Sequence, residues 1–215
     1  MIDHTLLKAE ATGVEVEKLC LEAKAYHFAS VCVQPYRVHL AAKLLESSNV
    51  NVCTVIGFPM GANSSAVKAM EVIRALADGA SELDMVMNLG AFKEQNYADV
   101  EGDIRAVIKA AQGRLVKVIL ETCLWSDEEI VKACQISVNA GASFVKTSTG
   151  FSKDGATRGH VALMRRAVGE NIGVKASGGI RDRKTFMQMI EAGANRIGTS
   201  SGVKLLEAGV SESDY

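Results

Sequence analysis

Strand-like and helix-like segments alternate about eight times along the 215 residues, with short connections between them. Such alternation predicts a parallel sheet covered by helices. Three similar junctions support this prediction: Asp78-Gly79-Ala80, Ala140-Gly141-Ala142 and Ala192-Gly193-Ala194 each end a predicted helix and lead directly into a predicted strand. The glycine suits a left-handed helix cap, and the alanine permits close packing of helix on sheet. Eight such units in a chain of this length favour an α/β fold of one domain, a (β/α)8 TIM barrel, over an open sheet.

The local patterns also give approximate bounds for each element. Strands are predicted at residues 2–6, 29–34, 51–58, 82–88, 115–121, 145–148, 172–176 and 196–199. Helices are predicted at residues 14–26, 36–46, 63–78, 98–111, 157–168 and 182–192, with another opening at 126 and a short one after 200. We expect the barrel to span residues 1–208 and residues 209–215 to form a flexible C-terminal tail. Tyr215 on that tail is a candidate lid, against the commoner alternative of a disordered terminus.

Composition excludes several classes of function. The net charge of −1 offers no basic face for nucleic acid and no polybasic membrane anchor. No apolar run reaches the length of a membrane span, and the first residues lack the features of a signal peptide. The 5 cysteines are odd in number and form no C-x-x-C motif, which indicates reduced thiols and a cytoplasmic protein. The 4 histidines lack metal-ligand spacing, so no zinc site is expected.

Side-chain alternation assigns the charged residues to the inside of the barrel. In the strand predicted at 82–88, Leu83, Met85 and Met87 share one apolar side, which should face the helices. Asp84 lies on the other side, which should face inward. Applied to every strand, this rule places six ionisable side chains in the interior: Asp3, Asp84, Lys117, Glu121, Lys146 and Lys175. That is more charge than a structural core needs, so it indicates a functional site; the alternative is a buried ion-pair network without chemistry.

Lys146 is the strongest candidate for a reactive group. It lies in residues 144–151, a short run that resembles a buried strand opening into small hydroxyl residues and a glycine. Burial tends to lower the pKa of a lysine, and the neutral amine is a nucleophile that forms Schiff bases with carbonyls. The alternative is a lysine that ends the strand and reaches solvent. Lys175, on the next predicted strand, favours the first interpretation because repulsion between two ammonium groups depresses the pKa of at least one. Asp84 then supplies a group that moves protons.

The last two strands end in glycine-rich loops. In barrels of this kind, the loops after strands seven and eight and the start of a short extra helix commonly bind a phosphate. The expected phosphate-binding residues share small side chains and free backbone N–H groups; they are Gly150, Gly178, Gly179, Gly198, Ser200 and Ser201. The alternative is that these glycines only form turns.

Four segments together resemble one known family: residues 2–5 (IDHT), 82–88 (ELDMVMN), 144–150 (FVKTSTG) and 174–181 (VKASGGIR). In this order they are similar to the deoxyribose-phosphate aldolases, and the similarity covers nearly the whole chain. The resemblance implies a class I aldolase, a lyase that reversibly cleaves 2-deoxy-D-ribose 5-phosphate to D-glyceraldehyde 3-phosphate and acetaldehyde through a lysine Schiff base. It implies a role in deoxyribonucleotide and carbohydrate catabolism. It implies no cofactor and no metal, because the iminium acts as the electron sink.

The resemblance also implies residue roles. Lys146 resembles the Schiff-base lysine, Asp84 the proton donor and acceptor, and Lys175 the second active lysine, which tunes Lys146 and joins the proton relay. Asp3 and Thr5 are expected near the substrate hydroxyls or a relay water. The glycines and serines of the last two loops and Gly150 resemble the phosphate-binding residues.

Some features depart from the family pattern. Many members carry a helix before the first strand, so a neighbouring subunit of a homo-oligomer would help to cover the barrel bottom here. Phe151 follows Gly150 where some relatives have a lysine for the phosphate, and Lys153 or Arg181 is expected to supply that charge. Cys32 is expected to line the barrel near the aldehyde, either as a packed thiol or as a thiol that an aldehyde modifies.

Two alternatives stay open. The first is another Schiff-base aldolase or transaldolase on the same scaffold, with a different donor. The second is a non-catalytic phosphosugar-binding barrel. Two adjacent buried lysines argue against the second, because a binding protein does not need them.

Overall fold

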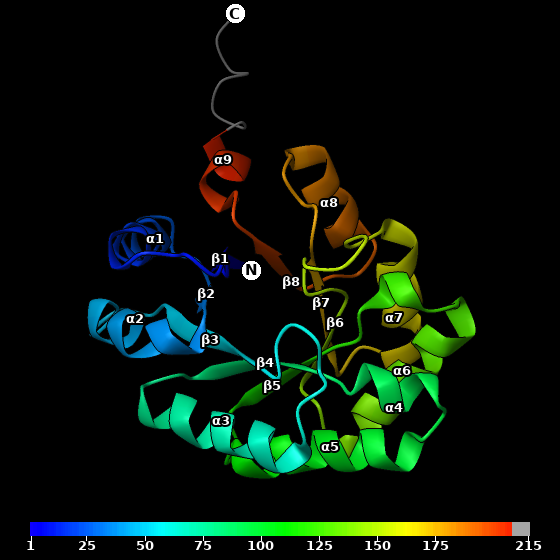
Figure 1. Ribbon diagram of the computed structural model, residues 1–215. Coiled ribbons are helices and arrows are strands. Elements are labelled where there is room, and N and C mark those ends of the chain that lie inside the picture. The colour runs from blue at the N-terminus through cyan, green and yellow to red at the C-terminus, as the bar shows by residue number, and fades with distance from the viewer. Residues whose placement is uncertain (208–215) are drawn as a thin grey trace, which may run out of the picture.

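Eight parallel strands form a closed barrel in the computed structural model, which describes residues 1–207 (Figure 1). Each strand pairs with the next in sequence, and β8 pairs with β1 to close the ring. The strands are β1 (Ile2–Leu6), β2 (Ser30–Val33), β3 (Asn51–Ile56), β4 (Glu82–Val86), β5 (Leu115–Ile119), β6 (Phe144–Lys146), β7 (Gly173–Ser177) and β8 (Arg196–Thr199). The predicted (β/α)8 barrel is confirmed. The predicted tail at residues 209–215 and the lid role of Tyr215 lie outside the described residues.

Helices surround the strands on the outside of the barrel, as Figure 1 shows. They are α1 (Gly13–Ala25), α2 (Val38–Leu44), α3 (Ser65–Ala77), α4 (Leu89–Lys93), α5 (Tyr97–Ala110), α6 (Asp127–Ala140), α7 (Arg158–Val168), α8 (Arg183–Glu191) and α9 (Gly202–Glu207). Short 3-10 turns occur at Pro35–Arg37 and Thr122–Leu124. Within residues 1–207, no helix combines the length and the apolar character that crossing a membrane requires.

The repeated glycine-alanine junctions act as the sequence predicts. Gly79, Gly141 and Gly193 have φ angles of 104°, 99° and 107°. The N–H of the following alanine donates to a carbonyl five residues earlier, as in Ala80 to Ala75. This hydrogen bond closes the helix end in the manner of a Schellman motif. The same turn therefore delivers β4, β6 and β8 to the barrel, and these strands carry Asp84, Lys146 and Arg196.

The hydrophobic core lies between the strands and the helices. Leu83 and Met85 on β4 are fully buried there, as the predicted alternation requires. Burial of each such side chain contributes about 1.5–3 kcal/mol. A second, small apolar cluster lies inside the barrel and consists of Leu7, Cys32, Cys53 and Val55, with Phe58 packed against it. We call it the inner apolar cluster.

The structure corrects several predicted bounds. The strands predicted at 51–58, 82–88 and 115–121 end two residues early, and the residues beyond them begin the loops above the barrel. Asn88 accepts a hydrogen bond from the N–H of Ala91 and starts α4, which the sequence analysis missed because five residues show no clear helical period. Glu121 adopts a left-handed φ of 56°, which ends β5.

Candidate active site

Charged side chains from six strands meet inside the barrel. They form a connected set of ion pairs, which we call the interior ion network; its members are Asp3, Glu82, Asp84, Lys117, Lys146, Lys175 and Arg196. Strand register explains the meeting, because Asp84 pairs with Lys117 and Lys146 pairs with Lys175 on adjacent strands. The inward direction predicted for these four side chains is therefore confirmed.

Asp84 lies at the centre of the network and is fully buried. Its Oδ2 atom accepts hydrogen bonds from Lys146 Nζ at 2.8 Å and from Lys175 Nζ at 2.7 Å. Its Oδ1 atom lies 2.9 Å from Lys117 Nζ and accepts from the Sγ of Cys53 at 3.2 Å. Burial favours the neutral acid, but the three ammonium groups outweigh it and hold the pKa of Asp84 well below its ordinary value. Asp84 is thus an ionised carboxylate shared by two lysines through one oxygen.

The two carboxylates beside Lys175 determine its protonation state. Its Nζ lies 2.6 Å from Asp3 Oδ2 as well as 2.7 Å from Asp84 Oδ2. Burial lowers the pKa of Lys175, but the two carboxylates outweigh burial and raise that pKa above its ordinary value. Lys175 therefore stays an ammonium group. The predicted repulsion between the lysines therefore does not set the pKa of Lys175, because two carboxylates touch this residue.

Lys117 and Arg196 complete the lower part of the network. Lys117 Nζ lies 2.7 Å from Glu82 Oε2, and Arg196 bonds the other oxygen of Glu82 at 2.6 Å and lies 3.3 Å from Asp3. Neither Glu82 nor Arg196 was singled out from the sequence, although both have the inward parity. Glu121 was expected in this set, but it accepts hydrogen bonds from the N–H and hydroxyl of Thr149 and joins none of the ion pairs among residues 1–207.

The network has an unequal charge count. Four cationic groups, Lys117, Lys146, Lys175 and Arg196, face three carboxylates, Asp3, Glu82 and Asp84. The pKa values of Lys117, Lys175 and Arg196 are all raised by carboxylates despite burial. Loss of one proton from the network would leave three positive and three negative groups.

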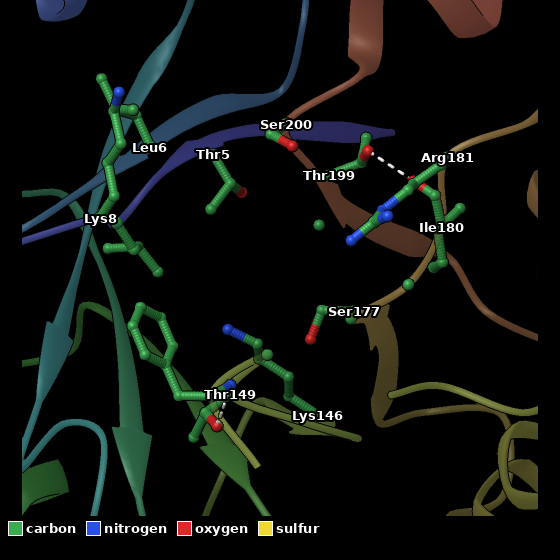
Figure 2. Close-up of a pocket in the computed structure, with 16 residues that line it drawn as sticks. Thr5, Leu6, Lys8, Lys146, Thr149, Ser177, Ile180, Arg181, Thr199 and Ser200 are labelled. Carbon is green, nitrogen blue, oxygen red and sulfur yellow. Dashed lines mark hydrogen bonds between the residues drawn. The ribbon is translucent and has the colours of Figure 1, made fainter. Parts of the chain in front are cut away.

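A cavity of about 330 Å³ opens above the network at the carboxyl ends of the strands. Figure 2 shows Lys146 beside this space, with Ser177, Arg181 and Ser200 bordering it from other strands and loops. Lys146 is the one member of the interior ion network among the residues that line it, counted over the described residues. Asp84 and Lys175 lie behind Lys146, fully buried. The amine of Lys146 is thus the group of the network that a ligand in the cavity would contact.

Most of the predicted phosphate-binding residues line the same cavity. Those present are Gly150, Gly178, Gly179, Gly198 and Ser200, together with Thr5. Gly150, Gly178 and Gly179 have φ angles of 85°, 86° and 77°, so their loops adopt turns that other residues rarely accept. Gly155 packs so closely on Gly178 that a Cβ atom would lie 2.2 Å from the Gly178 oxygen. Ser201 and Asp3 do not line the cavity: Ser201 donates its backbone N–H to Thr199, and Asp3 belongs to the network below.

Two further cations border the cavity, and no acidic side chain among residues 1–207 lines it. Arg181, one of the two residues predicted to supply a positive charge for the phosphate, lines the cavity. Lys153 does not, because its loop turns outward to a separate cavity lined by Cys123 and His160. Lys8 lines the site and was missed by the sequence analysis; its Nζ pairs with Glu15 at 2.6 Å. The absence of acids from this lining suits a ligand with negative charge.

The aromatic residue after Gly150 has a packing role. Phe151 lies edge-to-face against Phe58, with ring centroids 5.3 Å apart. Phe58 in turn packs on the inner apolar cluster, which contains the predicted barrel-lining Cys32. Phe151 also lines the cavity together with Leu6 and Leu7, so part of the cavity wall is apolar.

Comparisons with known proteins agree with this geometry. The family model described as "DeoC/LacD family aldolase" matches residues 1–211. A deoxyribose-phosphate aldolase of Lysinibacillus sphaericus is 59% identical over 216 residues, covering 100% of this chain and 97% of the relative. One of Clostridium tetani is 61% identical over 207 residues, covering 96% of each chain. A solved structure described as a tetrameric deoxyribose phosphate aldolase from Aeropyrum pernix superposes with a TM-score of 0.91 at 38% identity, covering 98% of this chain and 89% of that chain.

Proposed function

The chain belongs to the DeoC/LacD family of aldolases, and from that premise we propose how its own residues carry the reaction. Its activity is that of a deoxyribose-phosphate aldolase, a lyase that reversibly cleaves 2-deoxy-D-ribose 5-phosphate to D-glyceraldehyde 3-phosphate and acetaldehyde. One observation carries the proposed residue roles. Lys146 is the member of the interior ion network, among the described residues, that also lines the cavity.

Lys146 is the proposed nucleophile. Loss of one proton from Lys146 leaves three cations facing three carboxylates, so the buried network holds a neutral amine without a net charge. The amine attacks the aldehyde carbon of the open-chain sugar, and loss of water from the carbinolamine gives the iminium ion. As the bond between carbons 2 and 3 breaks, its electron pair passes into the iminium, and the hydroxyl on carbon 3 becomes an aldehyde by giving its proton to the proton carriers described next. Glyceraldehyde 3-phosphate then leaves, and an enamine of acetaldehyde stays on Lys146.

Asp84 and Lys175 are the proposed proton carriers. Both Lys146 and Lys175 donate to the same oxygen, Asp84 Oδ2, so a proton passes between the two amines without movement of the chain. The lowered pKa of Asp84 keeps it a carboxylate that returns each proton quickly. Lys175, held protonated by Asp3 and Asp84, supplies the proton that converts the enamine into the iminium of acetaldehyde, and addition of water to that iminium releases acetaldehyde and the amine of Lys146. Asp3 thereby acts on Lys175, and of the two predicted surroundings, substrate hydroxyls or a relay water, its contact with Lys175 favours a place in the proton relay.

The phosphate end of the substrate is proposed to lie against the loops after β7 and β8. Support comes from the glycine and serine lining, from the two cations Lys8 and Arg181, and from the lack of acidic side chains there among the described residues. Backbone N–H groups in glycine turns are suitable phosphate donors. Thr5 also lines the cavity and suits a substrate hydroxyl.

A donor comparison tests the activity. We expect condensation of D-glyceraldehyde 3-phosphate with acetaldehyde, and cleavage of 2-deoxyribose 5-phosphate much faster than of unphosphorylated 2-deoxyribose. Reaction with dihydroxyacetone alone would show that the chain is a different Schiff-base aldolase or a transaldolase. Binding of the phosphosugar without turnover would show a non-catalytic barrel.

We propose a homo-oligomer located in the cytoplasm. The Aeropyrum pernix relative is described as tetrameric, which supports an oligomer of this chain. All five cysteines fall within the described residues and are free thiols, which supports a reducing compartment. Light scattering after size-exclusion chromatography measures the mass; a monomer at micromolar concentration would contradict the first proposal.

A further inference from the structure

Two thiols lie beside the catalytic carboxylate, where the proposed reaction does not use them. Cys32 on β2 and Cys53 on β3 are direct register partners, and both side chains are fully buried inside the barrel. The two Sγ atoms and a carboxylate oxygen of Asp84 all lie within 4.8 Å of one another. The Cys53 Sγ atom is 3.2 Å from Asp84 Oδ1 and 3.5 Å from Lys117 Nζ.

The separation of the Cys53 and Asp84 ligand atoms is close to that in a soft-metal site. Zinc bonds thiolate sulfur at about 2.3 Å and carboxylate oxygen at about 2.1 Å, so tetrahedral geometry sets S···S near 3.8 Å and S···O near 3.6 Å. The observed Cys53–Asp84 separation of 3.2 Å differs from that by only a few tenths of an ångström. We propose that Cys32, Cys53 and Asp84 form a binding site for a thiophilic divalent cation such as Zn²⁺ or Cd²⁺, and that its occupation inhibits the enzyme.

The positive charge of the interior ion network determines which divalent cations can bind at the two thiols. The interior ion network already carries four cationic groups against three carboxylates, so a divalent ion that brings two extra charges is repelled. Binding through both thiols releases their two protons to solvent, which leaves the net charge of the site unchanged. Mg²⁺ and Ca²⁺ prefer oxygen ligands and do not gain this compensation. The site is therefore selective for thiolate-binding metals.

Inhibition follows from the position of Asp84, and this step rests on the proposed function. A metal ion on Oδ1 takes the place of Lys117 and draws the carboxylate toward β2 and β3. Oδ2 then loses its positions at 2.8 Å and 2.7 Å from Lys146 and Lys175. Proton transfer between the two amines stops, while the fold is retained.

The route to the site predicts slow binding. Both thiols belong to the inner apolar cluster, and another member of that cluster, Leu7, also lines the active-site cavity. A metal ion therefore enters through that cavity, past Leu7 and Phe58. We expect inhibition to develop over time and a bound phosphosugar to slow it.

Cadmium is the probe for binding, and this measurement does not depend on the aldolase reaction. Titration of the protein with Cd²⁺ is followed by thiolate-to-cadmium absorption in the ultraviolet, and equilibrium dialysis gives the stoichiometry. We expect one tightly bound ion per chain. Groups that only orient a metal ligand through a hydrogen bond contribute about 10–100-fold to metal affinity, so loss of a ligand itself in Cys32→Ser or Cys53→Ser should weaken binding by about 100-fold or more. Cys53→Ala provides a second variant if serine disturbs the fold, which circular dichroism reports.

Matched controls come from thiols elsewhere in the chain. Cys134 is equally buried but lies on α6, and Cys123 is a partly exposed thiol. Cys134→Ser and Cys123→Ser should bind Cd²⁺ as the unaltered protein does. Tight binding that persists in folded Cys32 and Cys53 variants would overturn the proposed site, as would binding lost in the Cys123 variant.

The rate measurement tests inhibition separately. Stoichiometric Cd²⁺ should slow cleavage by about tenfold or more, because the loss of one hydrogen bond between Asp84 and a buried ammonium group is worth at least that factor. A chelator should restore the rate. Mg²⁺ should have no effect. Each cysteine variant is compared with its own metal-free rate. Cadmium that binds both thiols and leaves the rate unchanged would overturn the inhibitory role, whereas an inactive metal-free protein would instead refute the proposed function.

Discussion

Replacement of Lys117 by methionine tests whether the interior ion network is as tightly coupled as its geometry indicates. Lys117 is fully buried, and its Nζ lies 2.7 Å from Glu82 and 2.9 Å from Asp84. Methionine fills a similar volume but leaves both carboxylates without this partner. Removing one partner of a buried pair costs about 3–5 kcal/mol, and here Glu82 and Asp84 each lose one direct contact with a buried cation while keeping their others. That is a large share of a typical unfolding free energy of about 5–15 kcal/mol.

Urea denaturation at neutral pH measures the loss. The control is Arg74→Met, which removes the same type of charge from an exposed pair with Asp78, in which Arg74 is 78% exposed. Exposed pairs contribute about 0–1 kcal/mol, so the control should change the unfolding free energy by less than that. A Lys117→Met loss no larger than the control loss would refute the coupling of the network.

The same variant has a pH signature. The pKa of Asp84 is depressed, so its stabilising contribution is present above the unfolded value of about 3.9 and is lost as the pH falls through the folded value. The pKa of Lys117 is raised, so its contribution is complete at neutral pH and is lost only as alkaline pH passes the folded value. The difference in unfolding free energy between Lys117→Met and the unaltered protein should therefore be constant near neutral pH and become smaller below about pH 4.

Three further substitutions test the site. Asp84→Asn keeps the size of the side chain but removes the proton acceptor, and turnover should fall by about 10²–10⁴-fold while a borohydride-reducible adduct still forms; an unchanged rate would exclude Asp84 from proton transfer. Arg181→Gln should raise KM for the phosphorylated sugar by about tenfold, the effect of one lost charged hydrogen bond, and leave cleavage of unphosphorylated 2-deoxyribose unchanged; equal effects on both sugars would contradict a phosphate contact. Gly198→Ala places a Cβ atom 3.0 Å from the Cε of Lys175 and 3.1 Å from the Cβ of Ser177, so kcat should fall while the fold persists; full activity would show that Lys175 tolerates displacement.

The sequence predicts the barrel well because the relevant rules are local. The glycine-alanine junctions specify the helix ends, and their left-handed glycines and buried alanines appear as expected at Gly79, Gly141 and Gly193. Side-chain alternation places Asp84 and Lys146 inside the barrel without knowledge of which strands touch. The short helix α4 was missed because its start depends on the Asn88 side chain, which bonds the N–H of Ala91.

Protonation could not be predicted in the same way, because it depends on contacts between distant strands. Repulsion between Lys146 and Lys175 is evident from two neighbouring strands. The contact that outweighs it for Lys175 comes from Asp3, which is 172 positions away in the sequence, across the closure of β1 on β8. Arg196 was overlooked for the same reason, since its partners lie on β1 and β4.

The cations that line the cavity near the phosphate-binding loops could be predicted from the sequence only in part. Arg181 follows the glycine pair directly, so sequence proximity suggested it, and it does line the cavity. Lys8 lies at the far end of the chain and reaches the cavity only because β1 is the neighbour of β8 in the closed barrel. Lys153 is nearer to Gly150 in sequence, yet its loop turns away.

Borohydride trapping tests the role of Lys146 most directly. The protein is incubated with 2-deoxyribose 5-phosphate, reduced with sodium borohydride, digested and mapped by mass spectrometry. A reduced adduct should appear on the peptide that contains Lys146, should require substrate, and should be absent from folded Lys146→Ala protein. An adduct on Lys175 or Lys117, or no adduct on a folded and active enzyme, would contradict the assignment of the nucleophile.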